Sequence, residues 1–217
     1  MAAVSLVIPQ KALIRASLSR DRARELPLAA GIDLPRGAVV ELAAPAGLGR
    51  MTQLALASCA AAQAEARAFS HDGDCRWCGW VDPSGSLYAP AVAEAGVDLE
   101  RLLLVRPDAE DIAKIAVRMA ASRVFAVLVI DRTGVPGARV TDTRIRWDIA
   151  VRRLALAIDN SDTTVVLLSE MEQARATPLP VAMRIELTRP SADRLSLRVV
   201  KDRRGIEGGA RIVALST

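Results

Sequence analysis

Aromatic residues, cysteine and histidine are scarce in this sequence of 217 residues, and each shortage excludes a class of protein. Aromatic residues make up only 3% of the chain, so the core must pack through the aliphatic side chains that dominate its 51% of hydrophobic residues. The three cysteines, Cys59, Cys75 and Cys78, do not form the even set of a secreted disulfide scaffold. Around the single histidine, His71, the sequence shows no pattern that indicates a Ser/His/Asp or Cys/His nucleophile.

Long apolar runs are also missing. Residues 124–130 form the longest uninterrupted run, which is far too short to span a membrane. Residues 4–8 are apolar but lack a basic leader and are too few for a signal peptide. We therefore expect a cytoplasmic protein with no membrane partner. The net charge of +4 permits binding to nucleic acid or to an acidic protein without establishing either.

Strands and helices are expected to alternate over most of the chain. A short β run at residues 37–42 precedes an Ala/Leu-rich helix at 50–66, and residues 124–130 are apolar on both faces, as in a central parallel strand. Residues 181–188 and 194–200 alternate apolar with polar, which is typical of antiparallel strands with one wet face. Further strands are expected at 76–81, 102–105, 164–168 and 212–215, and further helices at 87–95, 109–121 (capped by Asp108) and 145–158. The pattern predicts an α/β fold whose largely parallel sheet ends in an antiparallel β meander.

The turn between the first of these strands and its helix lies where a phosphate-binding loop belongs. Free backbone amides and the helix dipole hold an anion at such a place. Residues 44–52 read Ala-Pro-Ala-Gly-Leu-Gly-Arg-Met-Thr, which keeps the second motif glycine, Gly49, and also contains Gly47 and Thr52. An ordinary strand–turn–helix connection is the alternative interpretation.

The loop departs from the full motif at three positions, where Ala44 replaces Gly, Arg50 replaces Lys and Met51 replaces the hydroxyl that holds Mg²⁺. Asp131 closes the apolar strand at 124–130, the position of the acidic residue that supports the metal opposite such a loop. A solvated strand-end carboxylate is the alternative for Asp131.

A cysteine pair, Cys75-Arg-Trp-Cys78, has the spacing of half a zinc site, with His71 upstream. Zinc needs four ligands, and the remaining cysteine, Cys59, lies within the Ala-rich helix. Cys78 lies within a strand and is expected to point into the core. We expect no metal site.

In this order and spacing, the segments resemble the RecA recombinase core over residues 28–203. Residues 28–42 resemble the lead into the first core strand, and 44–52 the phosphate loop. Residues 80–87, Trp-Val-Asp-Pro-Ser-Gly-Ser-Leu, resemble the strand of the catalytic Glu, and 129–131, Val-Ile-Asp, the metal-side Asp. Residues 197–203 resemble the segment whose two lysines act across a protomer interface. The resemblance implies a three-layer RecA-like core, residues 28–217, after an extension, residues 1–27, with a possible docking strand and basic helix.

Several residues differ from what the resemblance expects. Arg50 is planar and bulky where a Lys is expected, and Met51 offers no oxygen to a hard cation. Ser84 stands in the place of the catalytic Glu, and losing a general base typically costs about 10²–10⁴ in rate. Glu170 replaces a nucleotide-sensing Gln, and residues 171–178 are shorter than the second DNA-binding loop. We therefore expect no ATP hydrolysis, no cofactor and no enzyme.

A small RecA-like chain with such a site resembles the ImuA accessory proteins, which are grouped with RecA/SulA-like sequences. That resemblance implies a non-catalytic role in DNA repair and the SOS response to DNA damage. Its partners would be RecA and a Y-family-like polymerase subunit, and it would modulate or inhibit RecA during translesion synthesis and mutagenesis.

For partner binding, the resemblance singles out two groups of residues. Lys201 and Arg203 are expected to reach a neighbour's nucleotide, and Val4, Leu6 and Ile8 to dock as a strand. One alternative is a nucleotide-dependent DNA-binding ATPase of the recombinase type. Another is weak, non-specific DNA binding through a basic face comprising Arg144, Arg146, Arg152 and Arg153.

Overall fold

The computed structural model describes residues 25–29, 31–69, 77–133, 146–205 and 209–214. Its strands are β1 (Glu25–Ala29), β2 (Ile32–Pro35), β3 (Val39–Ala44), β4 (Trp77–Val81), β5 (Leu102–Val105), β6 (Phe125–Asp131), β7 (Thr164–Glu170), β8 (Met183–Ser191), β9 (Arg194–Asp202) and β10 (Arg211–Ala214). Its α-helices are α2 (Arg50–Phe69), α3 (Ala89–Glu94), α4 (Ile112–Ser122), α5 (Trp147–Ala157) and α6 (Met171–Ala176). Val4, Leu6, Ile8, His71, Cys75 and Arg144 lie outside the described residues.

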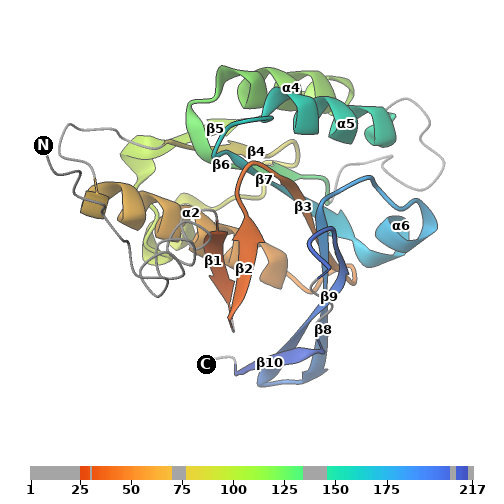
Figure 1. Ribbon diagram of the computed structural model, residues 1–217. Helices are drawn as coiled ribbons and strands as arrows, with labels where there is room; N and C mark the ends of the chain where they lie inside the picture. The colour runs from red at the N-terminus through yellow and green to blue at the C-terminus, as the bar shows by residue number, and fades with distance from the viewer. Residues whose placement is uncertain (1–24, 30, 70–76, 134–145, 206–208, 215–217) are drawn as a thin grey trace, which may run out of the picture.

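Eight strands form one sheet in the order β10-β9-β8-β3-β7-β6-β4-β5. The strands from β8 to β5 run parallel, and β9 and β10 then add antiparallel strands. Helices α4 and α5 cover one face of the sheet, while α2 and the β1–β2 hairpin cover the other (Figure 1). This three-layer arrangement confirms the predicted α/β fold, with its parallel sheet and terminal meander.

Two apolar cores lie on the two faces of the sheet because alternate residues of each central strand point to opposite sides. On the α2 face, Val40 and Leu42 of β3 pack with Trp80 of β4. On the α4–α5 face, Val39 of β3 packs with Ile130 of β6 and with residues of both helices. Both faces of the central strands are therefore buried, as their apolar sequences predict.

Helix α2 packs closely on the sheet through small residues. Ala55, Cys59, Ala62 and Ala66 recur at helical spacing and are all buried. Cys78 of β4 is also buried, and its thiol lies 3.7 Å from the Cys59 carbonyl oxygen, to which it donates. The expectation that Cys78 points into the core is confirmed.

The structure corrects three local predictions. Asp108 makes no side-chain capping bond, because residues 109–111 form a 3₁₀ turn before α4 begins at Ile112. The β1–β2 hairpin was not expected, and Leu26 of β1 is fully buried in the core on the α2 face. Arg184 of β8 was expected on a wet face but is buried, because β8 begins as an interior strand beside β3.

Within the described ranges, no helix combines the length and apolar character that crossing a bilayer requires.

Candidate functional site

Four parallel strands end at the same edge of the sheet and carry polar groups there. β3 leads into the loop at 45–49, β6 ends at Asp131, β7 ends at Glu170, and Asp82 follows β4. β7 lies between β3 and β6, so the loop and Asp131 flank its carboxyl end. In open α/β sheets, ligands bind in the crevice outside the carboxyl ends of the strands.

The loop between β3 and α2 keeps the backbone that its two glycines permit. Gly47 has φ of 77° and Gly49 has φ of 67°, both in the left-handed region that favours glycine. The Leu48 amide donates to the Pro45 carbonyl oxygen at 3.2 Å, which closes a turn directly before α2. Gly47 and Gly49 are solvent-exposed. The turn therefore presents backbone at the start of a long helix, where an anion can bind.

The first residues of α2 show where the side chains of the altered motif point. Arg50 donates from Nη1 to Oε1 of Gln53 at 2.5 Å, along the surface of its own helix. Met51 is buried and packs in the core on the α2 face. Thr52 is half-buried one residue further along. The loop thus retains its helix N-terminus, while position 51 contributes to packing.

Asp131 is a buried carboxylate held by its own turn. Its Oδ1 accepts hydrogen bonds from the Thr133 amide at 2.8 Å and the Thr133 hydroxyl at 2.6 Å. Burial raises the pKa of Asp131 above its ordinary value, and the nearby charge of Asp82 adds to this rise, while the hydrogen bonds from Thr133 lower it. The sequence placed Asp131 correctly at the strand end, but the carboxylate is enclosed and not freely solvated.

Asp82, at the end of the neighbouring strand, organises the turn that contains Ser84. Its Oδ1 accepts from the Ser84 hydroxyl at 3.2 Å and the Ser86 amide at 3.0 Å, and its Oδ2 from the Leu87 amide at 3.1 Å. Arg106 lies 3.7 Å from Oδ2. Ser84 is therefore exposed on a turn that Asp82 holds, a role for Asp82 that its position alone in the sequence did not reveal.

A buried charge cluster, formed by Glu41, Arg132 and Arg184, lies beside this edge and was not predicted. Arg184 Nε donates to Glu41 Oε2 at 2.7 Å, and Arg132 Nη1 lies 3.6 Å from Glu41 Oε1. Arg132 also donates to the Ser169 hydroxyl at 2.8 Å and lies 4.4 Å from the ring centroid of Trp147. Burial lowers the pKa of Arg132 to about 10, an effect that the charge of Glu41 opposes. The carboxylate of Glu41 therefore compensates the guanidinium groups of both Arg132 and Arg184. These contacts also hold Arg132, the residue that follows Asp131, in place.

Lys201 and Arg203 lie away from the loop at residues 45–49 of their own chain. The Arg203 amide donates to the Ala182 carbonyl, and the Ala182 amide donates to the carbonyl of Val39, the first residue of β3. Lys201 Nζ donates to the Leu179 carbonyl at 3.3 Å, and Arg203 Nη2 to the Pro180 carbonyl at 3.1 Å. Burial lowers the pKa of Lys201, and the charges of Arg203 and Arg184 add to that effect. Arg203 is thus level with the amino end of β3, whereas the loop leaves its carboxyl end.

The sequence was compared with those of curated proteins, and several RecA proteins match it. RecA proteins match from Acidiphilium cryptum (strain JF-5), 32% identical over 159 residues, and from Sinorhizobium medicae (strain WSM419), 31% identical over 160 residues. The chain has a RecA-like core. The RecA of Nocardia farcinica (strain IFM 10152) is 29% identical over 161 residues. These matches cover 67–68% of this chain but only 41–44% of the RecA proteins, so the chain spans less than half of their length. No family model matches the chain.

The similarity corrects the expectation that the chain is not an enzyme. RecA, to which the core is about 30% identical, is a DNA-dependent ATPase. The substitutions at Arg50, Met51 and Ser84 suggested an inactive site, but the curated proteins that match the chain are RecA proteins. That expectation is therefore wrong.

Proposed function

We propose that this chain is an accessory protein of DNA damage tolerance, similar to the ImuA proteins, that binds RecA and a Y-family-like polymerase subunit. In this role it modulates RecA activity during translesion mutagenesis. The observation that carries the proposal is the separation of Arg203 from the phosphate loop of its own chain within a RecA-like core. Basic residues at that place are positioned to meet a second protomer rather than their own site.

The other end of the sheet offers a second contact for a protomer. β5 is the edge strand, hydrogen-bonded only to β4 in the described part of the chain. Its Leu103 and Leu104 are both partly exposed. An edge strand presents unpaired backbone groups on which another strand can add. This edge supports docking to a RecA protomer through strand addition.

Charge reversal at Arg203 tests the proposed RecA contact. We expect Arg203→Glu to weaken binding to RecA by about 1–3 kcal/mol, because it replaces an attraction to a partner's anion with a repulsion. Lys201→Glu is expected to act in the same direction. Titration of labelled RecA with the purified full-length chain measures the change in affinity.

Arg198→Glu is the matched control, because Arg198 is exposed on β9, the strand that carries Lys201 and directly precedes Arg203. We expect this variant to bind RecA as the native chain does. Circular dichroism verifies that each variant is folded, since Lys201 and Arg203 also bond to the loop at residues 179–180. Equal affinity of the native and Arg203→Glu chains for RecA would remove this contact from the proposal.

A nucleotide-dependent, DNA-binding ATPase of the recombinase type is a second candidate. The similarity to RecA and the placement of Asp131 and the phosphate loop on either side of β7 favour it. Burial raises the pKa of Asp131 at the edge where nucleotide would bind, and perturbed pKa values are common at functional sites.

Phosphate release by the purified chain, measured with and without single-stranded DNA, separates the two candidates. If the chain is an ATPase, we expect Asp131→Ala to reduce turnover by about 10²-fold or more, the scale for losing a positioned acid–base group. Asp162→Ala, at an exposed turn remote from this edge, serves as the control. If the native chain releases phosphate no faster than the Asp131→Ala variant, both with and without single-stranded DNA, the ATPase candidate is rejected.

A further inference from the structure

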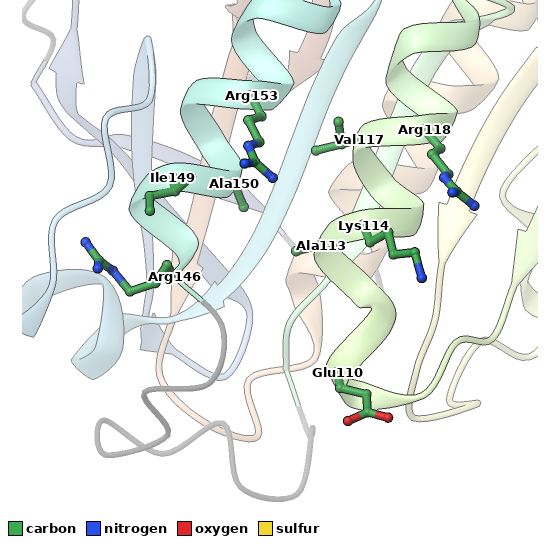
Figure 2. Close-up of a pocket in the computed structure, with 9 residues that line it drawn as sticks. All are labelled: Glu110, Ala113, Lys114, Val117, Arg118, Arg146, Ile149, Ala150 and Arg153. Atoms are coloured by element: carbon green, nitrogen blue, oxygen red, sulfur yellow. The ribbon is translucent and has the colours of Figure 1, made fainter.

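Helices α4 and α5 lie side by side on the outer face of the molecule and form a groove of about 510 Å³ between them. Figure 2 shows Ala113 and Val117 of α4 and Ala150 and Arg153 of α5 facing the space between the helices. Ala113, Val117 and Ala150 give this space an apolar floor, and Ile149, 38% exposed, also lines the groove from α5. The groove therefore offers an apolar strip to a partner of matching shape.

Positive charge borders this strip on both helices. Lys114 and Arg118 of α4, Arg146 directly before α5 and Arg153 of α5 line the groove, and Glu110 is the one acid among its described lining residues. In Figure 2, Arg153 points toward α4, whereas Lys114 and Arg118 lie on the side of α4 away from α5 and Arg146 points away from α4. Lys114 is bonded to Asp111 at 3.1 Å and Arg146 to Asp148 at 3.2 Å. Arg118 and Arg153 make no hydrogen bond or ion pair with any residue that the structure describes, so their charges are available to a partner.

From these features we infer that the α4–α5 groove binds an acidic amphipathic helical segment of a partner protein. An apolar stripe on that segment covers the floor, and carboxylates on its two flanks meet the cations of α4 and α5. Lys114 and Arg118 are four residues apart on α4, about 6 Å along the helix axis. Carboxylates spaced by one turn on the partner segment match this pair of cations.

Two other occupants fit less well. The extension of a second copy is basic, because residues 11–24 contain Lys11, Arg15, Arg20, Arg22 and Arg24 against Asp21 alone, and the groove repels it. A nucleic acid strand would match the charge, but no aromatic ring is among the described residues that line the groove, so its bases would have nothing there to stack on. Its phosphodiester backbone would also leave the apolar floor uncovered.

The test uses the full-length chain and a fluorescein-labelled amphipathic helical peptide with a leucine stripe flanked by glutamates. We expect saturable binding that weakens as ionic strength rises. The double substitution Arg118→Glu/Arg153→Glu should weaken binding by about tenfold or more, and Ile149→Ser by several-fold. Arg152→Glu, the neighbouring exposed residue that does not line the groove, should leave affinity within about twofold.

Two results would overturn the inference. One is peptide binding that is absent, or that is equal in the native chain and the Arg118→Glu/Arg153→Glu variant. The other is tighter binding of a labelled oligothymidylate than of the peptide, with the same dependence on Arg118 and Arg153, which would assign the groove to nucleic acid. RecA is absent from this assay, so its outcome is independent of the RecA contact proposed at Arg203.

Discussion

Replacing Glu41 with alanine is expected to destabilise the protein by about 3–5 kcal/mol, the scale for removing one partner of a buried ion pair. Glu41 is fully buried, and the side chains of Arg184 and Arg132 are only 9% and 11% exposed. Without the carboxylate, two enclosed guanidinium groups would face each other with no compensating charge. Denaturant unfolding followed by circular dichroism measures the loss.

Glu186→Ala is the matched control for Glu41→Ala. It also breaks a carboxylate–arginine pair, with Arg175 at 2.6 Å, but the Arg175 side chain is 61% exposed and is readily hydrated when unpaired. We expect a cost of about 0–1 kcal/mol there. Adding Arg184→Met to Glu41→Ala should recover part of the stability, because it removes one of the two stranded charges. A loss below about 1 kcal/mol for Glu41→Ala would show that the buried charge cluster is hydrated.

Truncation of Trp80 is the second large expected effect. Trp80 is fully buried in β4 between β5 and β6, and Trp80→Ala should cost about 3–5 kcal/mol through the cavity it leaves. Trp80→Phe should cost clearly less. The indole Nε1 of Trp80 has no hydrogen-bond partner in the part of the chain described here. Trp80→Phe therefore loses packing volume but no hydrogen bond.

Trp77 provides the comparison for Trp80, because it lies at the start of the same strand and is 38% exposed. We expect Trp77→Ala to cost about 1 kcal/mol, within the usual range for a partly exposed site. The stability of each tryptophan variant is measured by denaturant unfolding under the same conditions as the native chain. Equal losses at the two tryptophans would mean that the α2-side core relaxes around the cavity at Trp80.

The sequence predicted the central strands and the long helix because their patterns are unambiguous. Residues 124–130 are apolar without interruption, and they form β6 in the interior of the sheet. The Ala/Leu-rich segment after the loop forms α2, beginning at the predicted Arg50. The β1–β2 hairpin escaped prediction because Pro27 and Pro35 lie within its strands, and proline argues against a strand unless it lies at a sheet edge. The six-residue helix α6 is too short to show a helical period.

The candidate site was predicted in part. Asp131 lies at the strand end that its pattern indicated, and Gly47 and Gly49 have positive φ in the turn between β3 and α2. The buried charge cluster was missed because its members are distant in the sequence and each looks ordinary locally. The one available signal was Glu41, a lone charge within an otherwise apolar strand, which demands a buried partner.

Arg203 lies level with the amino end of β3, whereas the loop at residues 45–49 follows the carboxyl end of the same strand. The two ends of the molecule along this strand therefore present different surfaces. Contacts that join two different surfaces of identical or similar protomers run head to tail and do not close on themselves. A chain that joined a row of RecA protomers through only one of these surfaces would therefore sit at one particular end of the row. If the proposed contact with RecA forms, the effect on growth would differ between the two ends, as expected of a directional cap rather than of a uniform inhibitor.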